Sequence, residues 1–378
     1  MKLNFLHCIQ DSHFAESIIE EFKCVQDRIN NYYVVSSLKK TTNKKFIGQY
    51  DFIDYVHPFM LNRYIKEKRI NVIILHNILS IHSLNIIFIP KNVKVVWFAW
   101  GKDVYEIPRK LPFVHLNLYG PETLAYLKRH VGKQNLRLKI REYIECFLLY
   151  RAVQRVDYFS GVIPQEYKYI KQIKKVHAKE VFFHYSSLKK EIYQRNKKTD
   201  FNILINNSAD PSGNHLDILE KLSHIELGNR TIYVPLSYGG DVDYINEIIN
   251  RGRKLFRDNF VPITNYMPLD EYQKIIESCS FCIFGHERQQ AMGNIRLGLN
   301  TGCKVFLSSS SITYEYFKKI GVNVFSIQDD LNEKSISEIL SEEDSNNNAR
   351  IFNVYRSPEV FYMDLLKTID IIINDYKI

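Results

Sequence analysis

The stretch 281–307 reads FCIFGHERQQAMGNIRLGLNTGCKVFL. It begins with the apolar run FCIF, passes through a polar turn at Gly285–Asn294, continues with apolar residues at helical spacing, and ends in a second apolar run, KVFL. This order predicts a strand, a helix and a second, parallel strand. The free backbone N–H groups at the start of such a helix favour an anion at the end of the strand. Simple capping of the helix by the Gly-Asn turn is the alternative.

The rest of the second half of the chain alternates in the same way. Strands are expected at 201–206, 231–236, 281–284, 304–307 and 324–327, and helices at 215–222, 242–254, 269–278, 292–301 and 312–319. Strands separated by helical segments of roughly 10 to 15 residues are typical of βαβ units with a parallel sheet. This half is therefore predicted to be a Rossmann-like domain.

The first half has a similar but less regular pattern. Strands are expected at 2–6, 32–36, 71–75, 94–98 and 158–162, and helices at 13–24 and 57–68. The polar stretch 186–200 is the expected linker. Further on, 341–350 reads as a polar loop, and 359–376 as a terminal helix that packs back on the first domain. The predicted domains are 1–185, which binds acceptor and membrane, 186–345, which binds a nucleotide sugar, and 346–378, which returns to the first domain.

Composition limits the possible classes of protein. The chain has 378 residues, of which 45% are hydrophobic, and no window reaches the ~18 apolar residues of a membrane span. The apolar N-terminus predicts a first strand rather than a signal peptide, and hence a cytoplasmic protein. Cys279 and Cys282 have no second cysteine pair, so no metal site or disulfide is expected. Nothing in the sequence requires a divalent metal or another cofactor.

Positive charge is concentrated in one segment. The chain carries a net +9, and 128–155 holds eight Lys or Arg against two Glu, which indicates an anionic partner. Apolar residues at helical spacing accompany Arg137, Lys139 and Arg141. A helix lying on anionic lipid explains both the charge and the apolar stripe, with an ordinary core helix as the alternative. Nucleic acid is the weaker explanation, because no known reader motif is present.

Polar clusters follow several of the predicted strands. In the second half these are NNSADPSGNH at 206–215, PLSYGGD at 235–241 and TNYMP at 264–268. Ligands of two-domain α/β proteins bind in the cleft at the carboxyl ends of the strands. Ser208 and its neighbouring amides fit a diphosphate or a sugar, and the third cluster fits a nucleobase edge with an aromatic ring to stack on it. Turn formation and helix capping are the alternatives for each cluster.

The first half contributes two further clusters. WFAWGKDVYE at 97–106 places both tryptophans beside acids, and we expect Trp97 in the core and Trp100 with Asp103 at a sugar site. At the end of the first strand, Asp11 and His13 stand at a helix start. A carboxylate or imidazole at this edge is a candidate general base, with helix capping as the alternative.

Taken together, four motifs resemble one family. They are VWFAWGKDVYE at 96–106, NNSADPSGNH at 206–215, YVPLSYGGDVDYINEI at 233–248 and IFGHERQQAMGNIRLGLNTG at 283–302. They are similar to the TDP-N-acetylfucosamine:lipid II N-acetylfucosaminyltransferases, glycosyltransferase family 56. The resemblance implies the α/β fold called GT-B, two Rossmann-like domains facing across a cleft, with the donor held by the second and a lipid-linked acceptor by the first. Lys102 and the pair His286-Glu287 depart from the enterobacterial pattern and leave the exact sugar open.

The resemblance implies a metal-independent transferase that moves a 4-acetamido-4,6-dideoxyhexose from TDP to a polyprenyl-diphosphate-linked saccharide, in enterobacterial common antigen or O-antigen assembly. Such an enzyme would be peripheral, on the cytoplasmic face of the bacterial inner membrane, with anionic lipid as a partner and no nucleic acid. Whether it inverts or retains configuration stays open. A non-enzymatic sugar-nucleotide-binding protein and a sugar-nucleotide epimerase are the alternatives.

The expected site residues fall into three groups. The expected donor-binding residues are Asn207, Ser208, Asp210, Tyr238, Gly239, Tyr266, Met267, His286, Glu287, Arg288, Gln289, Gln290, Gly293 and Asn294. The acceptor-binding residues are Trp100, Lys102 and Glu106, and the catalytic base is Asp103, with Asp11 and His13 next. No metal ligand is expected.

Overall fold

The computed structural model of the chain describes residues 2–12, 14–38, 45–78, 83–105, 117–130, 136–185, 198 and 200–377. These residues form two compact units. The first unit comprises Met1–Leu116, Gln134–Lys190 and Arg356–Ile378, and the second comprises Asn117–Lys133 and Glu191–Tyr355. The expected linker at 186–200 lies almost entirely outside the described residues.

A parallel sheet is the centre of the first unit. Its strands are β1 (Leu3–Ile9), β2 (Ile29–Ser36), β3 (Ile53–Val56), β4 (Val72–His76), β5 (Lys94–Phe98), β6 (Tyr158–Ser160) and β7 (Lys179–Glu180), in the order β3-β2-β1-β4-β5-β6-β7. Its helices are α1 (Phe14–Lys23), η1 (Pro58–Met60), α2 (Leu61–Glu67), α3 (Ser83–Ile87), α6 (Leu136–Val153), η3 (Pro164–Glu166), α7 (Tyr167–Gln172) and α15 (Pro358–Lys377). Every adjacent pair of strands is parallel, as the sequence predicts.

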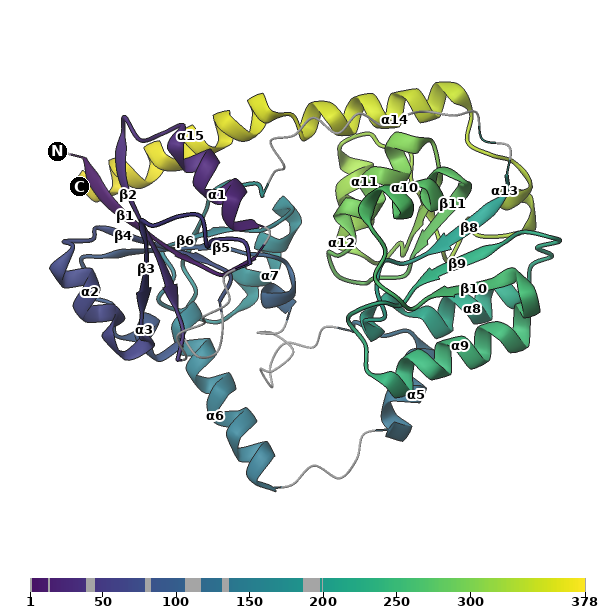
Figure 1. Ribbon diagram of the computed structural model, residues 1–378, viewed down its shortest axis with the longest axis horizontal. Helices are drawn as coiled ribbons and strands as arrows, with labels where there is room; N and C mark the ends of the chain where they lie inside the picture. Colours follow the sequence, from purple (N-terminus) through teal and green to yellow (C-terminus); the bar gives the residue numbers. More distant parts are fainter. Residues whose placement is uncertain are drawn as a thin grey trace. The chain divides into compact units, whose positions relative to one another are not determined.

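The terminal helix α15 packs on the first sheet, as the terminal apolar segment predicts. In Figure 1 it runs beside α1 on one face of that sheet. Leu365, Ile369 and Ile372 of α15 are buried in the same core cluster as Phe5 and Phe22. Burial of this apolar face against the sheet, rather than helix propensity, holds such a helix in place.

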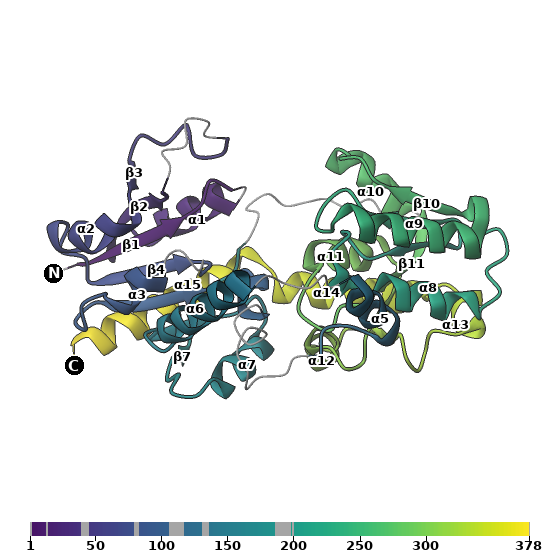
Figure 2. The same cartoon turned by 90° about the horizontal axis from the view of Figure 1, so that it is seen from below.

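The second unit contains another parallel sheet. Its strands are β8 (Asn202–Ile205), β9 (Ile232–Pro235), β10 (Phe260–Ile263), β11 (Cys279–Phe284), β12 (Lys304–Leu307) and β13 (Phe325–Ser326), in the order β10-β9-β8-β11-β12-β13. Its helices are α5 (Pro121–His130), η4 (Pro211–Gly213), α8 (His215–Ser223), α9 (Val242–Phe256), η5 (Arg257–Asn259), α10 (Leu269–Glu277), α11 (Met292–Thr301), α12 (Ile312–Lys319), α13 (Glu333–Ser337) and α14 (Glu342–Tyr355). Helices α5, α8 and α9 cover one face of this sheet, and α10, α11, α12 and α14 lie on the other (Figures 1 and 2).

Two sequence expectations about elements are corrected. The polar stretch 341–350 is not a loop, because it forms the start of α14, where three acids occupy the first turn and favour a helix N-terminus. Ala349 and Phe352 of α14 are buried, and α14 packs against α11. The strand β10 was not among the expected strands, and Pro262 lies within it. As the edge strand of the sheet, β10 tolerates a proline that a central strand does not.

The expected domain bounds differ from the two units in two places. Helix α5 lies within the expected first domain, 1–185, but packs on the second unit. There the carboxylate of Asp217 accepts hydrogen bonds from the backbone of Glu122 at 2.9 Å and of Thr123 at 3.1 Å, and from the Thr123 hydroxyl at 2.6 Å. Asp217 therefore supplies the cap that the first turn of α5 lacks in its own sequence. The second unit also extends to Tyr355, ten residues beyond the expected bound at 345.

Candidate functional site

The order of strands in the second unit places two loops side by side. From the neighbouring strands β8 and β11, the connections run in opposite directions across the sheet, to β9 and β10 on one side and to β12 and β13 on the other. Ligands of open parallel sheets bind at such a switch point, beyond the carboxyl ends of the strands. The loops after β8 and β11 begin at Asn206 and Gly285, and both carry predicted donor-binding residues.

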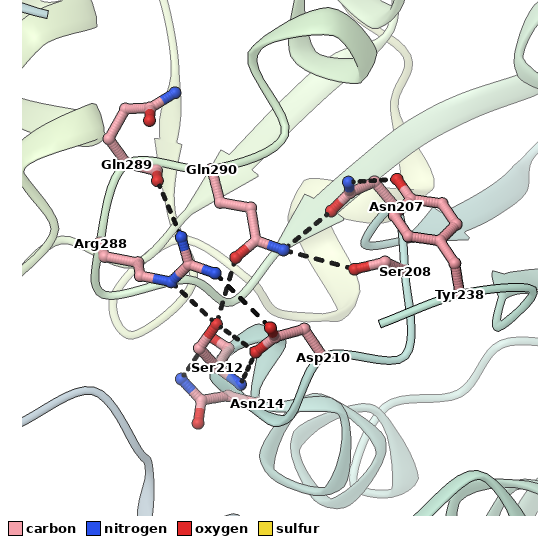
Figure 3. Close-up of polar contacts among 9 residues, drawn as sticks. All are labelled: Asn207, Ser208, Asp210, Ser212, Asn214, Tyr238, Arg288, Gln289 and Gln290. Carbon is pink, nitrogen blue, oxygen red and sulfur yellow. Dashed lines mark hydrogen bonds and ion pairs between the residues drawn. The ribbon is translucent and has the colours of Figure 1, made fainter. Parts of the chain in front are cut away.

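Arg288 joins the two loops (Figure 3). Its Nε donates to the Ser212 hydroxyl at 3.1 Å, and its Nη2 lies 3.6 Å from a carboxylate oxygen of Asp210. The other oxygen of Asp210 accepts from the backbone N–H of Ser212 at 2.9 Å. The guanidinium is thus held in a fixed orientation, and only 8% of its side chain is exposed.

Gln290 makes the second connection between the loops. Its amide nitrogen lies 3.3 Å from the Ser208 hydroxyl and 3.5 Å from the side-chain oxygen of Asn207, and its amide oxygen accepts from Ser212 at 3.1 Å. The amide of Asn207 donates to the hydroxyl of Tyr238 at 2.9 Å, which brings in the loop after β9. Figure 3 shows the Gln289 side chain turned away from this group, and only its carbonyl oxygen is near Arg288.

The two glycines after β9, Gly239 and Gly240, lie where the β9 loop passes close to the β8 loop. Gly239 has a φ of +92°, and a Cβ there would lie 3.3 Å from Ser208. A Cβ on Gly240 would collide with the carbonyl oxygen of Ala209. Because only glycine fits both the conformation and the space, the Gly-Gly pair is what lets the β9 loop pack on the β8 loop.

The first turn of α11 has no side-chain cap. The residue before the helix, Ala291, has a φ of +61° and makes no capping hydrogen bond through its side chain. Gly293 is exposed, with open space where a Cβ would be. Asn294, expected to bind donor, instead donates to the Tyr272 hydroxyl at 2.6 Å. The backbone of this turn, rather than the Asn294 side chain, is therefore the part suited to an anion.

Other predicted donor-binding residues occupy different surroundings. His286 is buried, and burial lowers its pKa well below the ordinary range, with Arg288 and His215 adding to the shift. The carboxylate of Glu287 is bound by the hydroxyls of Ser308 and Ser310, both at 2.6 Å. Glu287 therefore ties the β11 loop to the β12 loop.

The loop after β10 carries the expected nucleobase-stacking residue. Tyr266 is 89% exposed, and Met267 beside it is half-buried. An exposed ring of this kind is a suitable platform for a planar base.

In the first unit, Asp103 is buried and already bound. One carboxylate oxygen accepts from the indole N–H of Trp97 at 2.8 Å and the backbone of Ile78 at 3.3 Å, and the other accepts from the backbone of Trp100 at 3.0 Å. Burial raises the pKa of Asp103 to about 6, while these hydrogen bonds oppose the rise. With 5% of the residue exposed, Asp103 holds two loops together and does not offer an open oxygen to a substrate.

Of the other catalytic and acceptor candidates, Asp11 and Lys102 lie among the described residues. Asp11 accepts from the backbone N–H groups of Lys45, Phe46 and Ile47 at 2.8 to 3.2 Å, so it also orders a loop. Lys102 is exposed. His13 and Glu106 lie outside the described residues.

A buried acid, Glu166, was not among the expected site residues. Glu166 is fully buried beyond the end of β6, and its carboxylate accepts from the backbone of Val162 at 2.6 Å and Ile163 at 3.2 Å. Burial raises its pKa to about 7, opposed by hydrogen bonds and increased by Asp103. A glutamate two residues after a proline gives no sequence signal of this burial. Among the described residues, no group of three His, Cys, Asp or Glu is placed to hold a metal ion.

The basic segment 128–155 is divided between the two units. Lys128 and Arg129 belong to α5 of the second unit, and Arg141 of α6 pairs with Glu145 at 2.9 Å. Arg137 and Lys139 also lie on α6, but their side chains are not among those described. The helices that the structure describes include none long and apolar enough to cross a membrane.

Helix α6 also has a group of exposed apolar side chains. Ile140, Tyr143, Ile144 and Phe147 are 52 to 71% exposed. Their spacing of three and four residues places them on one side of the helix. The adjacent α3 packs against α6 and is followed by Phe88, which is 69% exposed.

Comparisons with known proteins agree with this architecture. Over nearly its whole length the chain superposes on the lipopolysaccharide outer core galactosyltransferase WaaB (TM-score 0.61, 13% identity, covering 98% of this chain and 99% of that one). It superposes similarly on WaaG, a glycosyltransferase of lipopolysaccharide biosynthesis (0.56, 11%, 98% and 99%), and on Anabaena Alr3699/HepE in complex with UDP (0.52, 11%, 96% and 93%). These likenesses establish the GT-B fold.

A family comparison is more specific than the fold. The profile described as 4-alpha-L-fucosyltransferase, glycosyl transferase group 56, matches residues 136–354, more than half of the chain. The matched region contains the polar loops after β8, β9 and β11. The chain is therefore a GT-B glycosyltransferase and belongs to glycosyltransferase group 56.

Proposed function

We propose that this glycosyltransferase moves a 4-acetamido-4,6-dideoxyhexose from a TDP-sugar to a polyprenyl-diphosphate-linked saccharide, in enterobacterial common antigen or O-antigen assembly. The observation that carries a nucleotide-sugar donor is the cluster of Arg288, Ser212, Gln290 and Ser208 at the switch point of the second sheet, beside the uncapped first turn of α11. The same fold holds UDP in the Anabaena protein, which supports a nucleoside diphosphate. The choice of thymidine and of the sugar rests on the family resemblance.

Transfer of the sugar releases a nucleoside diphosphate, and the second unit must stabilise the negative charge that develops on it. A guanidinium and free backbone N–H groups at a helix start both favour the developing negative charge. Asp210 holds Arg288 only at 3.6 Å, so a diphosphate can take over part of that interaction. Since these groups supply positive charge without a metal, we propose that transfer is metal-independent.

The first unit would bind the acceptor, through Trp100, Lys102 and Glu106, and would supply the base. Asp103 and Asp11 are occupied by backbone amides, so His13 becomes the first base to test. The exposed apolar face of α6 fits the interfacial region of a bilayer, where aromatic and aliphatic side chains insert beneath basic ones. We propose that this face, together with the basic residues Arg137, Lys139 and Arg141 of the same helix, holds the enzyme on the cytoplasmic face of the inner membrane.

A sugar-nucleotide-binding protein without activity, or an epimerase, would also need the donor site. Neither would transfer sugar to an acceptor, and neither would need a bilayer-binding helix. Release of TDP that depends on the presence of a diphosphate-linked saccharide therefore separates the proposed transferase from both.

The donor site is tested by titration calorimetry with TDP and UDP. Arg288→Ala is expected to weaken TDP binding by about 1 to 3 kcal/mol, the usual contribution of a charge-assisted hydrogen bond. The control is Arg350→Ala, which removes a guanidinium bound to Asn347 on an exposed face of α14. Equal TDP affinities for the two variants would contradict the assignment of Arg288, and tighter binding of UDP than of TDP would contradict the thymidine donor.

A further inference from the structure

The first unit has a switch point of its own. The neighbouring strands β1 and β4 lead to β2 and β3 on one side and to β5, β6 and β7 on the other. The loops that follow β1, β4 and β5 therefore meet at one edge of the sheet. These loops contain Ser12, Asn77 and Trp100 respectively.

Hydrogen bonds and ring contacts hold the three loops in register. Asp103 binds the backbone of both Ile78 and Trp100, and the backbone of Asn77 donates to the Phe98 carbonyl at 3.0 Å. The rings of Phe14 and Trp100 lie 5.1 Å apart, which links the β1 loop to the β5 loop. Asp103 is thus a positioning residue for this edge.

Each loop presents one buried polar atom without a hydrogen-bond partner among the described residues. They are the Ser12 hydroxyl, the side-chain oxygen of Asn77 and the indole nitrogen of Trp100. The indole lies near the Tyr185 hydroxyl but does not reach hydrogen-bond geometry with it. Buried polar atoms in native proteins are nearly always paired, so three unpaired atoms at one sheet edge are unusual.

The chemistry of the three atoms selects a class of ligand. An indole N–H donates, an amide oxygen accepts and a hydroxyl does both, which matches the hydroxyl and acetamido groups of a sugar. None of the three is cationic, and the buried carboxyl of Asp103 accepts a hydrogen bond from the backbone of Trp100. Negative charge on this carboxyl disfavours a diphosphate at the three atoms, whereas a neutral saccharide carries no charge to be repelled.

We propose that Ser12, Asn77 and Trp100 bind the saccharide of the acceptor, rather than its diphosphate, and that they set specificity for it. This rests on the proposed function. Burial of a sugar hydroxyl against each atom would complete the missing hydrogen bonds, and an acceptor lacking that hydroxyl would leave one of them unmade.

The experiment uses the full chain and a soluble acceptor with a short alkyl diphosphate-linked saccharide. The variants are Ser12→Ala, Trp100→Phe, which keeps a ring against Phe14, and Asn77→Gly. Asn77 has a φ of +80°, so glycine removes the amide without straining the backbone. The control is Asn30→Ala, because the Asn30 amide bonds only to Asn4 at an exposed position near the start of β2.

Each of the three variants is expected to raise the acceptor KM roughly tenfold, the effect of one lost hydrogen bond. Their TDP affinity, which belongs to the second unit, should equal that of the control. Wild-type acceptor KM in all three folded variants would overturn the inference and leave the proposed transferase standing. Failure of the unaltered protein to bind TDP or to transfer sugar would instead overturn the proposed function.

Discussion

At the scale of single residues, the charged groups near both sheet edges already have partners within the fold. Arg288 is held by Asp210 and Ser212, Asp103 by three N–H donors, and Glu166 by two backbone amides. Arg288 is therefore held in a fixed orientation, and Asp103 and Glu166 fix the loops whose backbone they bind. This preorganisation keeps the cost of ordering side chains low when a ligand binds.

Asp103→Asn separates a positioning role from a catalytic one. Asparagine replaces one accepting oxygen with an NH2 group, which would face an N–H donor of Trp97 or Trp100. We expect the free energy of unfolding, measured in urea, to fall by about 1 to 3 kcal/mol. The acceptor KM should rise more than kcat falls.

The comparison variants are Asp54→Asn, at an exposed carboxylate that binds Tyr64, and His13→Ala. A loss of turnover of at least about 10²-fold in Asp103→Asn with unchanged unfolding would mean that Asp103 is the general base after all. If only His13→Ala shows such a loss, His13 is supported as the general base.

Glu166→Gln tests the pH dependence of stability. The folded pKa of Glu166 is raised by burial to about 7, above the ordinary 4.5. Between these values the unfolded chain releases the proton while the folded protein keeps it, so the stabilisation present below pH 4.5 is lost as pH rises to 7. Glutamine keeps an accepting oxygen for Val162 and Ile163 and does not ionise.

The stability of Glu166→Gln relative to the unaltered protein should therefore increase between pH 4.5 and 7, by at most about 1.4 kcal/mol per pH unit. Urea unfolding at several pH values measures it, with Glu67→Gln, an exposed partner of Arg63, as the control. A relative stability independent of pH would show that Glu166 titrates normally.

At the scale of elements, α6 is unusual because four of its large apolar residues, Ile140, Tyr143, Ile144 and Phe147, are exposed. A core helix turns such a stripe toward the sheet, but Tyr143 is 71% and Phe147 55% exposed. Large apolar side chains grouped on one exposed helix face usually mark a binding surface. The basic residues of the same helix make lipid the expected partner.

Liposome sedimentation separates the apolar and basic contributions of α6. A double variant, Tyr143→Ser with Phe147→Ser, removes apolar side chains and should bind less to both neutral and anionic vesicles at every salt concentration. A second variant has Arg137, Lys139 and Arg141 changed to Gln. It should lose only the component of vesicle binding that falls with ionic strength, about 1 kcal/mol per residue before screening. Both variants should keep their TDP affinity. Binding by the apolar variant equal to that of the unaltered protein would remove α6 from the membrane surface.

At the scale of the whole molecule, two doubly wound sheets share one plan, with a switch point between neighbouring strands and polar loops beyond it. The chain does not divide simply into halves. Helix α5 from the first half completes the second unit, and α15 from the end of the chain completes the first. Each unit therefore depends on a segment distant in sequence, so truncation at either expected boundary removes part of a core.

Chelation tests whether the complete enzyme works without a metal. If Arg288 and the start of α11 stabilise the leaving diphosphate, transfer rates measured after dialysis against EDTA should stay within about twofold of the untreated rate, a difference of less than 0.5 kcal/mol in the barrier. Activity lost to EDTA and restored by magnesium or manganese would instead establish a required cation.

Local pattern was enough to predict the strands and helices around the proposed donor site. The helices at 292–301 and 312–319 and the strands at 94–98 and 304–307 begin and end where apolar periodicity and turn residues place them. The polar residues of the β8 and β11 loops could be expected to meet, because the carboxyl ends of parallel strands share one edge. The sequence placed Arg288, Gln290 and Ser208 in these loops, and the structure brings the three together.

Only the tertiary structure decided which polar residues are free and which are occupied. Asp103, Asp11 and Glu287 had the composition of site residues, but their partners come from other loops: Ile78 for Asp103, Phe46 for Asp11 and Ser308 for Glu287. The same holds for α5, whose capping residue Asp217 lies 94 positions from Thr123. Hydrogen bonds between distant segments follow from packing, and no periodicity along the chain encodes them.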